Sequence, residues 1–216
     1  MKAFIKYFML LAIIGFLLLG IWQLDRLAWK NTLLSSAKNN SSLAPINFTQ
    51  EEFHEGLLYR LVNFSGALVE NDKLVLIPES YKQEFYYRIM APIKIGKKNI
   101  LIDFGLTKNK KLKIPGNIKS RGIFFNFDRK NIFYPKNNPQ KLVWYNTDYQ
   151  TMQKYFGINI EPYYIKIVPG FSVSNELVIK PFATSYRNDH LMYAITWFLL
   201  AFFCSIIFYF RVKTNN

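Results

Sequence analysis

The chain has two histidines, and one of them stands directly before a long apolar run. His190 ends the polar stretch 187–190, which reads Arg-Asn-Asp-His, and an earlier apolar run ends in residues 22–26, Trp-Gln-Leu-Asp-Arg. If the two runs pack as antiparallel helices, an imidazole, two guanidiniums, two carboxylates and an indole meet in one layer at a membrane surface. An imidazole can ligate haem iron, and guanidiniums pair with carboxylates such as haem propionates. This layer therefore has the side chains that a haem site needs.

The candidate haem-binding residues all lie within about two helical turns of that membrane edge. They are His190 as the iron ligand, Arg26 and Arg187 as partners of the propionates, and Trp22, Tyr193 and Trp197 as apolar walls. Tyr193 and Trp197 follow His190 at i+3 and i+7, which places them on one helical face. A structural interpretation explains the same layer as an interfacial belt, in which Asp189 and His190 cap a helix and Arg26 pairs with Asp189. On the residues alone the structural interpretation is favoured, because polar residues at membrane edges are common.

The remaining reactive side chains exclude several classes of site. His54 is the second histidine and falls in an expected surface helix, so a three-histidine metal site cannot form. No phosphate-binding loop or nucleophile elbow is present. Cys204 is the one cysteine and lies inside an apolar run, which excludes an internal disulfide, a CxxC copper or redox site and covalent c-type haem. Because nothing supplies a turnover chemistry, we expect a protein that is not an enzyme.

Two apolar runs are long enough to cross a membrane as helices. Residues 4–24 contain only Lys6 and Gln23 as plainly polar members, and residues 191–210 contain no charge. No small-residue cleavage site follows the first run, so we expect a retained anchor rather than a signal peptide. The tails outside the runs are basic and carry no acidic residue; their basic residues are Lys2, Lys6, Arg211 and Lys213. We therefore expect both termini to be cytoplasmic and the domain between the runs to be periplasmic.

Residues 25–190 are expected to form one extracytoplasmic β-rich domain. Short apolar or alternating runs predict mainly antiparallel strands at 58–69, 73–77, 85–95, 99–104, 122–127, 142–145 and 163–168. The short connections at 71–72 and 96–97 predict hairpins. The expected fold class is a membrane-anchored α+β protein, with N- and C-terminal transmembrane helices flanking this domain.

Helical patterns interrupt the strands at three places. The stripe Trp22, Arg26, Trp29 and Leu33 predicts that the first helix continues beyond the membrane and ends within residues 35–42. Thr49 is a candidate cap of a short helix that reaches Gly56. Asp148 as N-cap and Gly157 as C-terminal stop predict a second short helix, with Tyr149, Met152 and Phe156 on the face that packs against the sheet.

The charge of the chain is strongly basic. There are 28 lysines and arginines against 14 acidic residues, and every acidic residue lies between the two apolar runs. The basic residues are scattered except for a dense run at 108–113, and no nucleic-acid-binding motif accompanies them. We expect no nucleic-acid partner; attraction to the anionic surface of a lipid bilayer explains the charge better.

The two helix ends together resemble the Surfeit-locus cytochrome c oxidase assembly family. The signature at the end of its first helix is similar to residues 20–30, which read Gly-Ile-Trp-Gln-Leu-Asp-Arg-Leu-Ala-Trp-Lys, and the signature entering its second helix is similar to residues 187–197. Further matching segments follow in the family's order, at 87–92, 134–139, 144–148 and 162–165. The resemblance covers nearly the whole chain, and its motifs are specific only in combination.

The resemblance implies a multi-pass chaperone of the bacterial inner membrane that acts in respiratory-chain biogenesis. The family assists cytochrome c oxidase assembly, with oxidase subunits as partners and haem a as a transiently bound cofactor delivered to the catalytic subunit. The histidine proposed to bind haem in the family aligns with His190, which favours the haem interpretation. Two places depart from the family pattern: Asp189 stands where Asn is usual, and Phe104-Gly105-Leu106 stands where Arg-Gly-Trp is usual.

Two other functions stay open at this point. In the first, the chain is a haem-free membrane scaffold that binds oxidase subunits during assembly, and His190 is structural. In the second, the central domain is a sensor between two spans, which is disfavoured because residues 211–216 are too few to carry a signalling domain. No mitochondrial transit segment precedes the first span, so a bacterial protein is expected.

Overall fold

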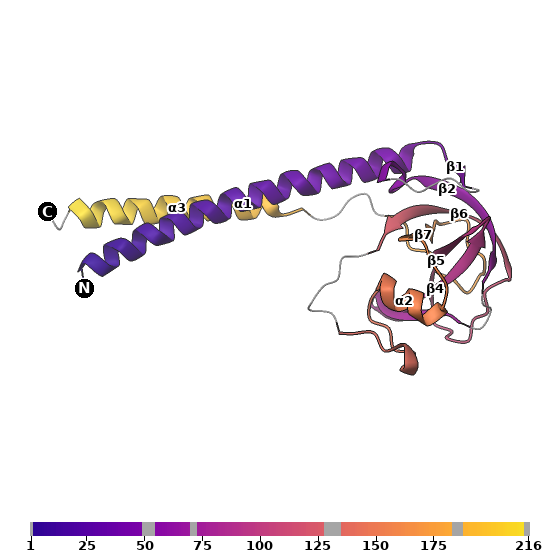
Figure 1. The fold of residues 1–216 in the computed structure, drawn as a ribbon. Coiled ribbons are helices and arrows are strands. Elements are labelled where there is room, and N and C mark those ends of the chain that lie inside the picture. The colour runs from indigo at the N-terminus through magenta and orange to yellow at the C-terminus, as the bar shows by residue number, and fades with distance from the viewer. Residues whose placement is uncertain (1, 49–54, 70–72, 128–134, 183–187, 214–216) are drawn as a thin grey trace. The chain divides into compact units, whose positions relative to one another are not determined.

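The computed structural model describes residues 2–48, 55–69, 73–127, 135–182 and 188–213 (Figure 1). The helices are α1 (Lys2–Ser42), α2 (Tyr149–Phe156) and α3 (His190–Lys213), with 3-10 helices η1 (Glu55–Leu57) and η2 (Pro139–Lys141). The strands are β1 (Ile46–Phe48), β2 (Leu61–Leu68), β3 (Val75–Tyr81), β4 (Glu84–Ile95), β5 (Lys98–Thr107), β6 (Asn117–Asn126) and β7 (Tyr163–Ile167). They form two units, a helical unit of residues 1–36 and 184–216 and a barrel unit of residues 37–183.

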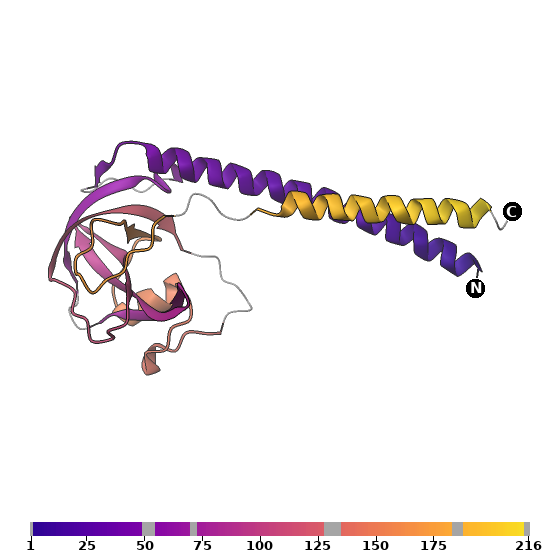
Figure 2. The same cartoon turned by 180° about the vertical axis from the view of Figure 1, so that it is seen from behind.

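The helical unit consists of two apolar helices that run side by side in opposite directions, with the two termini at the same end (Figures 1 and 2). Both helices are long and apolar enough to cross a membrane, and only 6% of the apolar window of α1 and 11% of that of α3 is buried. A core helix of a soluble domain would bury most of its apolar side chains. Such exposure suits contact with lipid, because water would penalise it.

The first helix continues well past its apolar part, as the sequence predicts. It passes residue 25 without a break and ends at Ser42, inside the polar stretch 35–42 where we expected its end. Its last turn belongs to the barrel unit, where the Asn40 side-chain amide donates to the carbonyl oxygen of Leu58 at 2.8 Å. The start of the barrel unit is therefore 37, within the helix.

The barrel unit is built on a seven-stranded sheet of order β1-β2-β6-β7-β5-β4-β3. The last residues of β2 also pair with β4, through Ala67 with Lys94 and Leu68 with Ile93. This extra pairing closes β2, β6, β7, β5 and β4 into a ring, with β1 and β3 attached outside it. The sheet is mostly antiparallel, as expected, and the pairs β1–β2 and β5–β7 are parallel.

The inward-facing side chains of the ring form the main core. Strand alternation directs one residue in two to the inside, so β5 contributes Ile100, Ile102 and Phe104, each fully buried. Phe124 of β6 makes edge contacts with Phe48 at 5.1 Å and with Tyr163 at 5.4 Å between ring centroids. The interior is thus filled by side chains and leaves the functional surfaces to the outside of the barrel.

The short helix α2 packs on the outside of the barrel, with the bounds that the sequence predicts. The Asp148 side chain accepts from the backbone N–H of Gln150 at 3.1 Å, and Gly157 ends the helix in the left-handed region at φ 68°. Met152 and Phe156 are buried, as expected. They form a second core, which also contains Trp144 and three residues on the outer face of the sheet, Val75, Met90 and Leu101.

One predicted strand is wrong, and one short strand was not predicted. Residues 142–145 are apolar because Trp144 is buried in the second core, not because they extend in a sheet. Leu142 lies in the left-handed region at φ 55°, and Val143 forms only an isolated bridge with Asn138. Strand β1 was not expected. The cap at Thr49 lies outside the described residues. The predicted hairpin at 71–72 is wrong, because the strands on either side of it, β2 and β3, do not pair with each other, whereas the hairpin at 96–97 is confirmed.

Substitution of Gly66 by alanine is expected to destabilise the barrel unit by about 2–3 kcal/mol, because overpacking has no room to relax against backbone. A Cβ at Gly66 would lie 2.4 Å from the carbonyl oxygen of Lys94, where β2 passes from β6 to β4. Gly116→Ala is the matched control, since nothing lies within 4 Å of its Cβ. Protease susceptibility of the full chain along a urea titration in detergent measures both; equal midpoints would show that closure of the barrel tolerates the methyl group.

Candidate functional site

The helices α1 and α3 meet along a seam of small residues. Ala194 and Ala201 are 1% and 3% exposed, as expected for close helix contact, and a Cβ at Gly20 would lie 2.6 Å from Cε1 of Phe198. Thr196, a small residue on the same helix, is exposed instead, and its hydroxyl donates to the carbonyl oxygen of Met192 at 2.9 Å. The seam fixes which side chains meet at the end where α3 begins.

His190 is the first residue of α3 and bonds across the seam to α1. Its Nδ1 lies 2.7 Å from Oε1 of Gln23, and the contact is partly buried. With the amide oxygen as acceptor, the bond needs a proton on Nδ1, so the lone pair of the neutral ring stays on Nε2. A metal-ligating histidine commonly donates its other ring N–H to an oxygen in this way. Gln23 therefore sets the tautomer and the orientation in which His190 can ligate iron.

A second polar bond crosses the seam beside His190. The side-chain amide of Asn188 donates to Oδ1 of Asn31 at 2.9 Å. Oδ1 of Asn188 itself is buried and accepts no hydrogen bond from the described part of the chain.

Arg26 lies on an exposed face of α1 between two indole rings. Its guanidinium carbon is 5.7 Å from the ring centroid of Trp22 and 5.6 Å from that of Trp29. These contacts are cation–π interactions along the predicted i, i+4, i+7 stripe. They hold a cation at the aromatic level of a membrane edge, where carboxylate groups of a ligand can reach it.

Of the described residues predicted for the haem site, the structure brings only Trp22 and Arg26 into contact. Arg26 contacts Trp22, whereas Trp197 stacks on Phe16 of α1 with ring centroids 5.8 Å apart. Tyr193 is exposed on the first turn of α3, and its backbone N–H bonds to the carbonyl oxygen of Asp189 at 3.1 Å. Arg187 lies outside the described residues.

Sequence reasoning missed Gln23 as the partner of His190. A signal was present, because Gln23 is the one uncharged polar side chain of the first apolar run, and an amide at that depth needs a partner. Within the described ranges, no three His, Cys, Asp or Glu side chains cluster to hold a bare metal ion. The single imidazole with a free Nε2 instead suits an iron whose other ligands come from a porphyrin.

Comparison with known proteins decides the family. The sequence model of the SURF1 family matches residues 10–202, which include the seam, His190 and the whole barrel unit. This chain belongs to the SURF1 family. A SURF1-like protein from Rickettsia conorii is 31% identical over 204 residues, which cover 88% of this chain and 83% of the relative. Surfeit locus protein 1 from Gallus gallus is 26% identical over 237 residues, covering 96% and 75% of the two chains.

One of the two departures from the usual pattern in this SURF1-family chain, at residues 104–106, is buried in the barrel unit. Phe104 is fully buried and Leu106 is 1% exposed. The backbone of Leu106 exchanges two hydrogen bonds with that of Val178, at 2.8 and 2.9 Å. Gly105 between them has φ 101°, and a Cβ there would meet Ile179. These positions hold the segment around residue 178 on the sheet.

The barrel of this SURF1-family chain also holds a charge cluster that sequence reasoning did not find. Arg88 lies 2.7 Å from Glu79, which also pairs with Lys180, and Nε of Arg88 is 4.0 Å from Asp103. Asp103 is 2% exposed and sits opposite Lys166 in the register of β5 and β7. Burial lowers the pKa of Lys166, while the carboxylate of Asp103 partly offsets this. Asp103 lies inside β5, which continues past the predicted strand 99–104 to Thr107.

Proposed function

We propose that this chain is a non-enzymatic assembly factor for cytochrome c oxidase, which holds haem a at His190 and passes it to the catalytic subunit. Membership of the SURF1 family and the resemblance of its helix ends to the oxidase assembly family support the role in assembly. The observation that carries the haem site is the 2.7 Å bond between His190 and Gln23, because it leaves Nε2 free as a ligand.

The residues present fit a haem at the end of the seam. His190 would hold the iron through its imidazole, and the haem would supply the iron. Arg26, held by Trp22 and Trp29, would pair with its carboxylates. The apolar faces of both helices exclude water from one side. Since a lone imidazole binds haem less tightly than a closed two-ligand pocket would, the site suits a carrier that must release its cargo.

The place of action follows from the same residues. Two exposed apolar helices anchor the chain in a bilayer, and the basic tails favour a cytoplasmic location of both termini. The His190 end of the seam then faces the periplasmic side of a bacterial inner membrane, together with the domain between the helices. Oxidase subunits would dock from within the membrane or on that side.

The test is purification of the full chain in mild detergent from cells that make haem a and produce the oxidase catalytic subunit. The expected result is the catalytic subunit in the same fraction, and haem a in the reduced-minus-oxidised spectrum of the chain after that subunit has been separated from it. The subunit without haem would overturn the haem site and leave the haem-free scaffold. Folded chain with neither haem nor subunit would overturn the role in oxidase assembly.

Replacement of Gln23 by leucine is expected to weaken haem binding by about tenfold or more, the usual effect of removing the partner of a ligating histidine. Gln23→Glu is the matched variant, because it keeps an oxygen acceptor for Nδ1–H. A carboxylate partner makes the imidazole more basic, so that it donates more electron density to the iron. The midpoint potential of bound haem should therefore fall in this variant. Haem titration and redox titration check both. Unchanged affinity in Gln23→Leu would show that the bond does not orient the ligand.

A further inference from the structure

An open groove lies on the barrel unit over β1, β2 and β6. Its volume is about 590 Å³, within the range of ligand pockets. The residues that line it come from these three strands and from the segment after β7: Asn47, Phe48, Asn63, Phe64, Ser65, Lys119, Ser120, Arg121 and Phe171. The sequence analysis assigned no role to any of them, and the candidate haem site uses none.

A ladder of side chains across the groove orients one guanidinium. Nε of Arg121 donates to Oδ1 of Asn63 at 2.7 Å, and the amide of Asn63 donates to Oδ1 of Asn47 at 3.0 Å. The three residues are neighbours in register across β6, β2 and β1. The guanidinium carbon also lies 4.5 Å from the ring centroid of Phe171. Because Nε and the flat face are occupied in this way, the two terminal amino groups remain as a planar fork for an anion.

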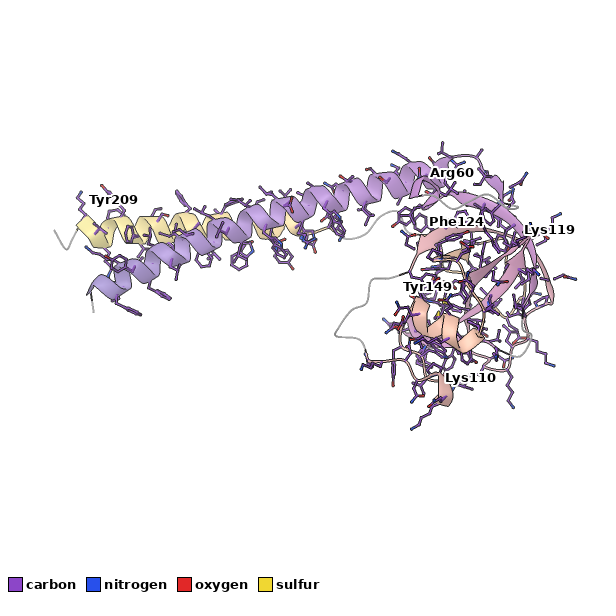
Figure 3. All side chains as sticks on the ribbon, in the orientation of Figure 1. Arg60, Lys110, Lys119, Phe124, Tyr149 and Tyr209 are labelled. Carbon is purple, nitrogen blue, oxygen red and sulfur yellow. The ribbon has the colours of Figure 1, made fainter. Side chains whose placement is uncertain are left out.

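The charge of the groove is positive and uncompensated by its own lining. Lys119 stands beside Arg121 on the same face of β6, and Figure 3 shows its side chain projecting from the surface of the barrel. No acidic residue is among the nine described residues that line the groove. Two cations with an aromatic wall and exposed strand backbone favour a carboxylate carried on a partly apolar body.

The groove also adjoins the last strand of the sheet, whose outer edge pairs with no other described strand. β1 stands at the end of the strand order and is paired with β2 on one side. Its three residues contribute Asn47 and Phe48 to the groove. The free edge of an outer strand accepts an extended peptide through main-chain hydrogen bonds, and pockets beside the edge select its side chains. A free small anion would use Arg121 but not this edge.

We propose that this groove is a docking site for an extended acidic peptide segment of a partner protein. One end of the segment pairs with the outer edge of β1, and the segment then crosses the groove, so that a carboxylate farther along it binds the terminal amino groups of Arg121, with Lys119 as a second cation. The partner is thus recognised by the barrel unit independently of haem.

The probe is a fluorescent synthetic peptide that alternates valine with aspartate, added to the full chain in mild detergent. Its matched control alternates valine with asparagine. We expect fluorescence anisotropy to show binding of the acidic peptide, at least about tenfold weaker binding of the asparagine peptide, and a similar loss in Arg121→Gln, as for a charge-assisted bidentate contact. Lys154→Gln removes one exposed charge from α2 and should bind as the parent does.

Hydrogen exchange distinguishes strand pairing from charge attraction alone, because charge attraction would not protect the backbone amides of β1. Amides of residues 46–48 should gain protection when the acidic peptide is bound, because its backbone pairs with the edge of β1. Lys119→Gln, which changes an exposed side chain, gives a second variant if Arg121→Gln unfolds. The proposal is overturned if both groove variants bind the acidic peptide as Lys154→Gln does, or if the asparagine peptide binds equally well. It is also overturned if dodecanoate, a single carboxylate on an apolar chain, displaces the peptide and the peptide itself gives no protection at residues 46–48.

Discussion

Haem a is expected to be lost from the purified chain when His190 is replaced by alanine. His190 is the only described imidazole at the seam, and its Nε2 is the one ring nitrogen left free by the bond to Gln23. Alanine removes the imidazole that Gln23 orients, so the haem per chain should fall by more than about tenfold. The seam itself should persist, because Ala194, Ala201 and Gly20 hold it below the site.

The matched control is His54→Ala, which removes the other histidine of the chain. Reduced-minus-oxidised spectra and haem stoichiometry of the parent and both variants, purified alike, make the measurement. Loss in His190→Ala alone identifies the ligand. Equal haem content in His190→Ala and the parent would show that another residue ligates the iron. Loss of haem from both variants would show that the loss is not specific to His190. Binding of exogenous imidazole to His190→Ala with recovered haem would further separate lost ligation from lost folding.

Local patterns predicted the parts of the fold that depend on neighbouring residues. Alternation predicted most strands, and Asp148 and Gly157 predicted both ends of α2, because caps act within one helical turn. The apolar runs predicted the two long helices. The failure at 142–145 has the same origin, since a buried Trp144 gives an apolar run without a strand.

The parts that could not be predicted depend on pairs far apart in the sequence. Closure of the barrel joins Ala67 to Lys94, and the parallel pair of β5 and β7 joins Leu101 to Tyr164. Neither pairing leaves a periodic trace in one sequence. The need for glycine at position 66 is likewise visible only once β4 is known to pass close to its Cα.

The candidate site divides in the same way. The position of His190 at a membrane edge follows from one apolar run, and the stripe of Trp22, Arg26 and Trp29 follows from helical spacing. The bond from His190 to Gln23 requires the phase of one helix against the other, which small residues at the seam determine. The groove at Arg121 requires the register of three strands, so its residues look unremarkable along the chain.

Replacement of Asp103 by asparagine is expected to destabilise the barrel unit by about 3 kcal/mol. The change keeps the side-chain oxygen that accepts the backbone N–H of Gly105 at 2.9 Å and removes only the charge. The partly buried ammonium of Lys166 then loses the carboxylate opposite it and is left as an uncompensated charge, whereas Arg88 keeps Glu79 as a partner. Asp148→Asn is the matched control, because asparagine caps a helix as well as aspartate does.

The pH dependence of stability distinguishes the loss of charge compensation at Lys166 from a loss of packing, because a packing defect would not change that dependence. Burial lowers the pKa of Lys166 from its ordinary value of 10.5, so the unfolded chain binds more protons between the lowered pKa and 10.5. Stability linked to Lys166 therefore rises with pH through that window. Without the carboxylate of Asp103 the pKa of Lys166 falls further, so in Asp103→Asn the rise should begin at a lower pH than in the parent.

A double-mutant cycle with Lys166→Met isolates the pair. If Asp103 acts by compensating Lys166, the loss caused by Asp103→Asn should shrink by about 1 kcal/mol or more in the Lys166→Met background, since coupled neighbours are not additive. Urea titrations of the full chain in detergent, with protease susceptibility as the readout, measure all four proteins across pH. The pairing of Asp103 with Lys166 across β5 and β7 would be contradicted if the two stability losses were strictly additive and the parent and Asp103→Asn had parallel pH profiles. The loss in Asp103→Asn would then be assigned to Arg88 alone.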